Sequence, residues 1–184
     1  MENTENLPKG ELEGERVTVW DKEHANQIFS NGWYGELSEK KLELALVEAA
    51  LLLERQKVEV YKGKSKIDFQ KLYKHALKID PRFSARYIVY KDLRERGLPT
   101  RTGFKFGCDF RVYERGVSPI KKGPKEAHEH TKWIVFCVPE DYACSFQELS
   151  RAVRLAHNIR SHMLWAIIDN DGAVTYYEIN YLSP

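Results

Sequence analysis

The sequence has little of what several protein classes require. Its 184 residues hold no apolar run close to the roughly 20 residues that a membrane-spanning helix needs. Its three cysteines, Cys108, Cys137 and Cys144, form no C-x-x-C pair, so neither a disulfide scaffold nor a structural zinc site is expected. The first six residues are polar and acidic, unlike a signal peptide. We therefore expect a reduced cytoplasmic protein that has no membrane partner.

Several catalytic motifs are also missing. No G-x-G-x-x-G follows a strand pattern, and neither G-x-x-x-x-G-K-[ST] nor G-x-S-x-G occurs, which argues against dinucleotide, P-loop and serine-hydrolase sites. A metal-dependent nuclease would carry E-x-K on a strand, but the one E-x-K here, at 39–41, falls at an expected helix start. The motifs that remain favour chemistry without a bound cofactor.

Composition and patterning predict an α+β protein of two units. Hydrophobic residues make up 42% and charged residues 30%, enough for a core and a solvated surface. The net charge of +2 permits RNA binding without demonstrating it. The residue before a proline disfavours helical geometry, so Asp80-Pro81 marks a boundary. We expect an N-terminal α/β domain over residues 1–81 and a C-terminal domain over 82–184.

Local signals predict the elements of the N-terminal part. A β-branched and aromatic run predicts a strand over 17–20, and alternation predicts another over 58–61. Apolar residues between Leu42 and Leu53 recur at helical spacing, which predicts a helix with Ser38 at its N-cap. Asp68 is expected to cap a second helix.

The C-terminal part alternates helical and strand patterns. A helix over about 82–96 should end at Gly97, in the C′ position. Between residues 101 and 115, aromatic and cationic residues alternate, which predicts a half-buried hairpin with a basic face. The apolar run at 133–138 predicts a buried central strand. Ser145 and Glu148 form a capping box for a helix to about residue 160 that turns Phe146 inward; strands at 163–168 and 174–181 should flank a turn at 169–172.

Residues near 113–130 could support RNA cleavage without a metal. Such cleavage needs a base for the 2′-hydroxyl, an acid for the 5′-oxygen and a cation for the phosphorane. Tyr113 could be the base where nearby cations lower its pKa from about 10, and Arg111 and Arg115 flank it. Histidine is a natural acid at neutral pH. His128 and His130 could instead bind a metal, but no third ligand is evident, so no metal is expected.

Four segments resemble a known family. They are K-D-L-R-x-R-G at 91–97, D-F-x-x-Y at 109–113, the run at 151–160 and the ending from Tyr176. Together they closely resemble the archaeal tRNA-splicing endonucleases. The resemblance implies a small N-terminal α/β domain and a C-terminal nuclease-like domain of the restriction-endonuclease kind, with a mixed sheet. It also implies homo- or hetero-oligomers, typically tetramers. These cut precursor tRNA at bulge-helix-bulge junctions, leave 2′,3′-cyclic phosphate and 5′-hydroxyl ends, and need no metal or other cofactor.

The resemblance further implies a tyrosine–histidine–lysine triad. The tyrosine corresponds to Tyr113 and the histidine to His130, with His128 as the other register. The lysine position holds Ser161, and a hydroxyl carries no charge to stabilise a phosphorane. Three explanations are open: a deliberately inactivated chain, a weak or partner-dependent subunit, or rescue by a neighbour, Arg160 or His162. The opposing interpretation is a structural or RNA-binding subunit without turnover.

Four further residues have roles that the resemblance implies. Arg154 would pack against a bulged base. Asp169 and Asp171, in the predicted turn, would enter a basic cleft of a neighbouring subunit. Tyr177, on the last strand, would lie at an edge that pairs between subunits.

Overall fold

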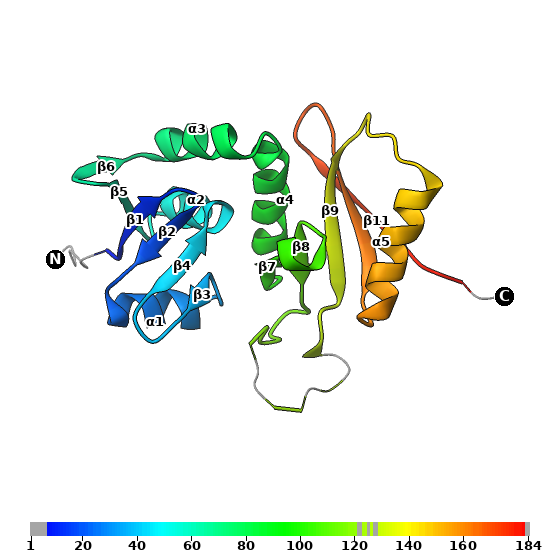
Figure 1. Cartoon of the computed structure of the whole chain (residues 1–184), viewed down its shortest axis with the longest axis horizontal. Coiled ribbons are helices and arrows are strands. Elements are labelled where there is room, and N and C mark those ends of the chain that lie inside the picture. The colour runs from blue at the N-terminus through cyan, green and yellow to red at the C-terminus, as the bar shows by residue number, and fades with distance from the viewer. Residues whose placement is uncertain (1–6, 121–122, 125, 127–128, 183–184) are drawn as a thin grey trace. The chain divides into compact units, whose positions relative to one another are not determined.

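The chain forms two compact units that divide between Phe83 and Ser84, and each is described here by itself. The computed structural model describes residues 7–120, 123–124, 126 and 129–182 (Figure 1). No helix among these residues has both the length and the apolar character needed to cross a membrane.

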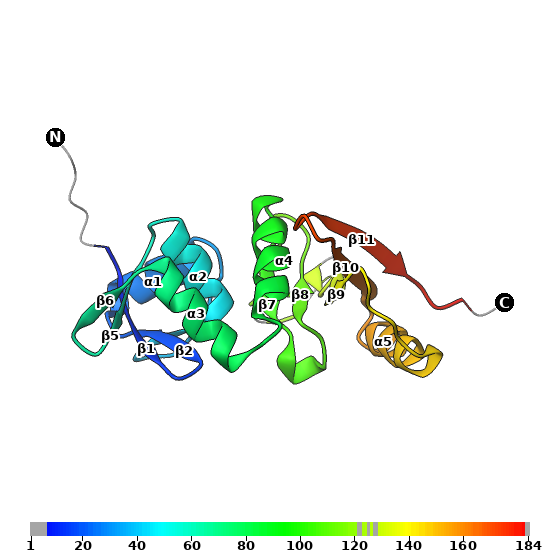
Figure 2. The same ribbon diagram turned by 90° about the horizontal axis from the view of Figure 1, so that it is seen from above.

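The N-terminal unit is a six-stranded sheet in the order β3-β4-β2-β1-β5-β6, with helices packed against it (Figures 1 and 2). Strands β1 and β5 are parallel, and the other neighbours are antiparallel, so the sheet is mixed. Its elements are β1 (Lys9–Glu13), β2 (Arg16–Val19), α1 (Lys22–Ser30), β3 (Glu36–Leu37), β4 (Leu42–Ala45), α2 (Leu46–Glu54), β5 (Glu59–Lys62), β6 (Ser65–Ile67) and α3 (Phe69–Ile79).

The strands at 16–19 and 59–62 and the helix capped by Asp68 confirm three local predictions. The Asp68 carboxylate accepts a hydrogen bond from the Lys71 backbone N–H at 2.8 Å, which satisfies an otherwise unpaired helical donor.

The prediction of Ser38 as a helix N-cap is wrong. Residues 42–45 form strand β4, and the helix begins only at Leu46. Leu42 and Leu44 are both fully buried on one face of the sheet, so the period of two governs this segment although its apolar spacing also fits a helix. The Ser38 hydroxyl instead closes a turn by donating to the Lys41 carbonyl at 3.0 Å.

Glu48 in α2 makes the contacts expected of a buried cap. It is 3% exposed, and its carboxylate accepts from the backbone N–H groups of Gly35 and Ala45, both at 2.9 Å. Glu48→Ala should lower the free energy of unfolding by about 2 kcal/mol, because it leaves these donors without an acceptor. Glu48→Gln should lose less, since its amide oxygen still accepts one bond. Urea denaturation measures both, and a cost for Ser38→Ala equal to that of Glu48→Ala would contradict this assignment.

The C-terminal unit is a mixed five-stranded sheet in the order β11-β10-β9-β8-β7. Strands β9 and β10 are parallel and joined through α5, and the other pairs are antiparallel. Its elements are α4 (Phe83–Glu95), β7 (Thr100–Thr102), the 3-10 helix η1 (Phe104–Phe106), β8 (Phe110–Val112), β9 (Trp133–Pro139), α5 (Phe146–Asn158), β10 (His162–Ile168) and β11 (Val174–Ile179). The two mixed sheets and their helices confirm the predicted α+β class.

Both predicted ends of the long helices are confirmed. After α4, Gly97 has φ +76°, and the N–H groups of Gly97 and Leu98 donate to the carbonyls of Arg94 and Leu93, which is a Schellman ending. Before α5, the Ser145 hydroxyl accepts from the Glu148 N–H at 3.2 Å, while the Glu148 carboxylate accepts from the Ser145 N–H at 2.8 Å.

One expectation for this unit needs correction. Phe146 is 90% exposed rather than inward, because the core contacts of α5 begin one turn later, at Leu149. The hairpin predicted for the aromatic and basic stretch is confirmed, because β7 and β8 pair antiparallel. A 3-10 turn separates β7 from β8, and it brings the Phe106 ring under the Arg111 guanidinium, 4.2 Å from centroid to Cζ.

Candidate active site

The ends of three adjacent strands bring the predicted triad positions together. Tyr113 follows β8 directly and is 3% exposed, with its backbone N–H bonded to the Pro99 carbonyl at 2.9 Å. At the same end of the sheet, the Lys132 N–H donates to the carbonyl of Val112, the last residue of β8, at 2.9 Å. The residue after β8 and the residues before β9 therefore lie side by side.

Ser161 approaches the same place from the third strand. Its hydroxyl donates to the Thr131 carbonyl at 2.7 Å, and the next residue, His162, donates its backbone N–H to the Lys132 carbonyl at 2.8 Å. His130 is exposed and adjoins Thr131 in the chain. Tyr113, His130 and Ser161 thus gather where β8 ends and where β9 and β10 begin, although they are far apart in sequence. The other register, His128, lies outside the described residues.

The Ser161 side chain is committed to the backbone. The residue is 8% exposed, and its hydroxyl hydrogen is used by the Thr131 carbonyl. The position therefore supplies neither a charge nor a free donor to a phosphate.

Two neighbouring basic side chains, those of Lys132 and His162, contact other partners. Lys132 Nζ lies 2.6 Å from Glu114 Oε1 and 4.4 Å from the Trp133 ring centroid. His162 Nδ1 lies 2.9 Å from Asn180 Oδ1 and 3.3 Å from Glu178 Oε1, on the side of β11. Arg160 adopts a left-handed backbone, φ +55°. None of these contacts aims a cation at the Ser161 position.

The arginines that flank Tyr113 also have other partners. Arg111 stacks on Phe106, and Arg115 Nε donates to the Arg96 carbonyl at 2.9 Å. Neither contact involves the Tyr113 phenol.

The remaining predicted residues lie elsewhere in the unit. Asp169 and Asp171 follow β10, at the end opposite to Ser161, and seven strand residues span about 23 Å. Asp169 accepts from the N–H groups of Asp171 and Ala173, so it closes its own turn. Arg154 is exposed on α5, with its guanidinium on the Ser150 hydroxyl at 2.9 Å. Tyr177 is 55% exposed on the edge strand β11.

The described residues show neither a metal-ligand cluster nor an activated thiol at this edge. No group of three or more histidine, cysteine, aspartate or glutamate side chains is placed to hold a metal ion within the described residues. Burial raises the pKa of the Cys108 thiol to about 12, which makes it a poor nucleophile at neutral pH.

A buried ion pair behind the site was not anticipated from the sequence. Arg86 Nε in α4 lies 3.2 Å from Asp109 Oδ1, and the two side chains are only 6% and 5% exposed. The second Asp109 oxygen accepts from the Cys137 N–H in β9 at 2.8 Å. Asp109 therefore ties α4, the start of β8 and β9 together four residues before Tyr113. The D-F-x-x-Y motif contained this residue, but its partners are distant in sequence.

The K-D-L-R-x-R-G motif holds α4 to the sheet. Asp92 accepts from the Tyr176 hydroxyl of β11 at 2.6 Å and pairs with Arg96 at 2.7 Å. Burial and the Asp92 bond raise the pKa of the Tyr176 phenol well above its ordinary value. Arg94 donates to the Thr100 carbonyl at 2.8 Å. These contacts stabilise the fold, and none of them involves Tyr113, His130 or Ser161.

Comparison with known proteins finds a family model for each part of the chain. The family model "tRNA intron endonuclease, catalytic C-terminal domain" matches residues 83–176, and "tRNA intron endonuclease, N-terminal domain" matches residues 8–73. A tRNA-splicing endonuclease of Thermococcus kodakarensis is 40% identical over 93% of this chain and 96% of its own length. One of Methanococcus vannielii is 40% identical over 93% of this chain and 92% of its own.

A third relative is longer. The tRNA-splicing endonuclease of Methanococcoides burtonii is 38% identical over 91% of this chain, but the match spans 46% of the relative. The two family models and these relatives confirm the resemblance, and the chain belongs to the tRNA intron endonuclease family.

Proposed function

We propose that this chain is a subunit of a tRNA-splicing endonuclease that cuts precursor tRNA at bulge-helix-bulge junctions without a metal. The observation that carries the proposal is the meeting of Tyr113, His130 and Ser161 at one end of the β8-β9-β10 sheet. The names of the relatives support the substrate class.

The proposed reaction uses Tyr113 and His130 as its two proton-transfer groups. Tyr113, as the phenolate, would take the proton from the 2′-hydroxyl and become the neutral phenol, and the 2′-oxygen then attacks the adjacent phosphorus. His130, exposed to solvent, would protonate the departing 5′-oxygen. The phosphate becomes a 2′,3′-cyclic diester, and the other fragment leaves with a 5′-hydroxyl. Neither step transfers electrons to a cofactor.

Ser161 limits this site. The phosphorane gains negative charge that a preorganised cation would stabilise, and the serine hydroxyl is neutral and bonded to Thr131. The chain should therefore bind the junction and cut it slowly by itself.

The remaining site residues belong to the same proposal. The Arg154 guanidinium, exposed on α5, would stack on a base of the bulge. Tyr177 on β11 and the turn that carries Asp169 and Asp171 would contact a second subunit in a homo- or hetero-oligomer, typically a tetramer. In the relative from Methanococcoides burtonii, the match spans less than half of the relative's own length, which leaves room in that relative for a second unit of this kind.

The test is cleavage of a bulge-helix-bulge RNA by the purified chain in EDTA, with end-group analysis. We expect binding and slow cutting to cyclic-phosphate and 5′-hydroxyl ends, and no cutting of an RNA duplex of equal length without bulges. Cutting that requires a divalent ion would overturn the metal-free mechanism. Fast cutting would overturn the interpretation of Ser161. Binding with no cutting, even after the charge is restored at position 161, would favour the structural subunit.

A further inference from the structure

The N-terminal unit carries a concentration of positive charge that the candidate active site does not use. Residues 57–79 contain seven lysines and two carboxylates, a net charge of +5, whereas the whole chain carries +2. This segment covers β5, β6 and α3. The rest of the chain is therefore net acidic.

The lysines lie on the outer surface of one hairpin and one helix. We call the exposed lysines of β5, β6 and α3 the lysine ridge: Lys62, Lys64, Lys66, Lys71, Lys74 and Lys78. In α3 three of them recur at i, i+3 and i+7, a spacing that places them on one helix face. The opposite face of α3 is buried through Leu72 and Ala76 and packs on α2.

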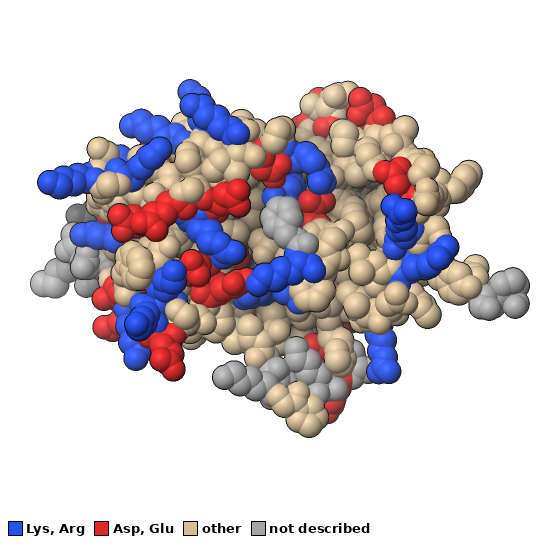
Figure 3. Space-filling model, in the orientation of Figure 1, with Lys and Arg blue, Asp and Glu red and all other residues tan. Residues whose placement is uncertain are grey.

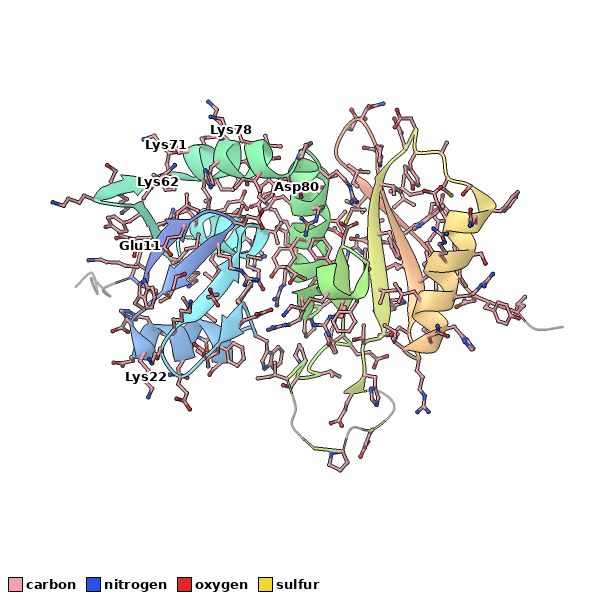
Figure 4. The ribbon with its side chains drawn as sticks, in the orientation of Figure 1. Glu11, Lys22, Lys62, Lys71, Lys78 and Asp80 are labelled. Carbon is pink, nitrogen blue, oxygen red and sulfur yellow. The ribbon has the colours of Figure 1, made fainter. Side chains whose placement is uncertain are left out.

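The figures show the ridge as one edge of this unit. The blue of lysine and arginine gathers over α3 and the β5–β6 hairpin in Figure 3. In Figure 4, Lys71 and Lys78 point outward from α3, and Lys62 lies on the same edge, whereas Lys22 lies on α1 at the opposite edge. Hairpin and helix are continuous in the chain, because only Asp68 separates β6 from α3.

Most of this charge is not neutralised within the protein. Lys66 pairs with Glu59, and Lys71 lies 3.7 Å from Asp68. Lys62, Lys64, Lys74 and Lys78 form no ion pair with any residue that the structure describes. Lys74 and Lys78 are like charges at i, i+4, an arrangement that destabilises a helix. An external polyanion would relieve this repulsion.

We propose that the lysine ridge binds the phosphate backbone of duplex RNA, independently of sequence and outside the cleavage site. Ammonium groups on flexible stems suit phosphates along a helix, and such contacts position an RNA without reading its bases. α3 is about 16 Å long, enough to span several phosphates. The inference rests on the proposed function for its substrate class, and it gives the N-terminal unit a role in holding the precursor.

An anionic membrane is the alternative polyanion, and the structure favours RNA. A helix that lies in a membrane surface exposes an apolar face to the lipid, but α3 buries Leu72 and Ala76 within the protein. The exposed face of α3 carries Lys71, Lys74 and Lys78, with Ile79 as an exposed apolar residue at its C-terminal end.

The test compares two matched double variants of the full chain, with the native Ser161 retained. Lys74→Gln/Lys78→Gln removes two unpaired ridge charges, and Lys22→Gln/Lys40→Gln removes two exposed charges elsewhere on the same unit. The probe is a fluorescent RNA duplex without bulges, titrated across a range of salt concentrations.

The slope of log K against log salt is negative, where K is the association constant for the duplex. The ridge variant should reduce the magnitude of this slope by about 1.8 relative to the unaltered chain, because each phosphate contact contributes about 0.9. Where the two chains have equal affinities extrapolated to 1 M salt, this difference in slope makes the ridge variant bind the duplex roughly 30-fold more weakly at 0.15 M salt. The control should change neither value appreciably. Equal slopes for the two variants would overturn the proposal. The same variants are also titrated with phosphatidylserine vesicles. A loss of binding by the ridge variant that occurs with the vesicles and not with the duplex would overturn the proposal as well, because it would assign the ridge to membranes.

The outcomes separate this inference from the proposed function. Cutting of the junction RNA depends on the C-terminal unit, and duplex binding by the ridge depends on the N-terminal unit. Junction cutting with unchanged duplex binding in the ridge variant would refute the inference alone.

Discussion

Ser161→Lys should raise the rate of junction cleavage by about 10²–10³, because one preorganised electrostatic group in an active site typically contributes that much. The new ammonium would replace a hydroxyl that now bonds to Thr131, beside His130. Rates under single-turnover conditions in EDTA, at saturating chain, measure the chemical step apart from binding.

The charge, rather than the length, of the new side chain should matter. Ser161→Met introduces a stem of similar reach without the ammonium and should give no gain. Adding Tyr113→Phe or His130→Ala to the lysine variant should remove most of the gain, because the base or the acid is then missing. Equal rates for the lysine and methionine variants would contradict the assigned role of position 161. A gain that survived the loss of Tyr113 and His130 would contradict theirs.

Local chemistry made much of the fold predictable. The caps at Asp68 and Ser145 and the ending at Gly97 depend on residues within six positions of one another, so their signals are visible in sequence. The segment Leu42–Ala45 shows the limit. Its apolar residues fit both the period of a helix and the period of a strand. The segment forms a strand because β4 pairs with β2, which the sequence does not show.

The contacts around the proposed site residues could not be inferred from the sequence. The resemblance to the family proposed Tyr113, His130 and, at the lysine position, Ser161. That Ser161 spends its hydroxyl on a carbonyl 30 residues away follows only from the register of β9 and β10. The same holds for Arg86 and Asp109, whose pairing needs α4 to lie against β8.

The Arg86–Asp109 pair carries the second large expected effect. Asp109→Ala should lower the free energy of unfolding of the C-terminal unit by about 3–5 kcal/mol, because it leaves the buried Arg86 guanidinium without its carboxylate. It also removes the acceptor of the Cys137 N–H. Urea denaturation followed by tryptophan fluorescence measures the change, since Trp133 and Trp165 lie in this sheet.

Two further variants identify the cause of this loss. Arg86→Leu/Asp109→Leu removes both charges and should be less destabilised than Asp109→Ala alone, since no uncompensated charge stays buried. Arg16→Gln breaks an exposed pair with Glu36, 4.0 Å apart with both side chains nearly half exposed, and should cost less than about 1 kcal/mol. A double variant as unstable as Asp109→Ala would mean that the Cys137 bond, rather than the ion pair, holds this corner. In either case Asp109 fixes the strand that carries Tyr113, so the same residue that stabilises the fold also sets the position of the proposed base.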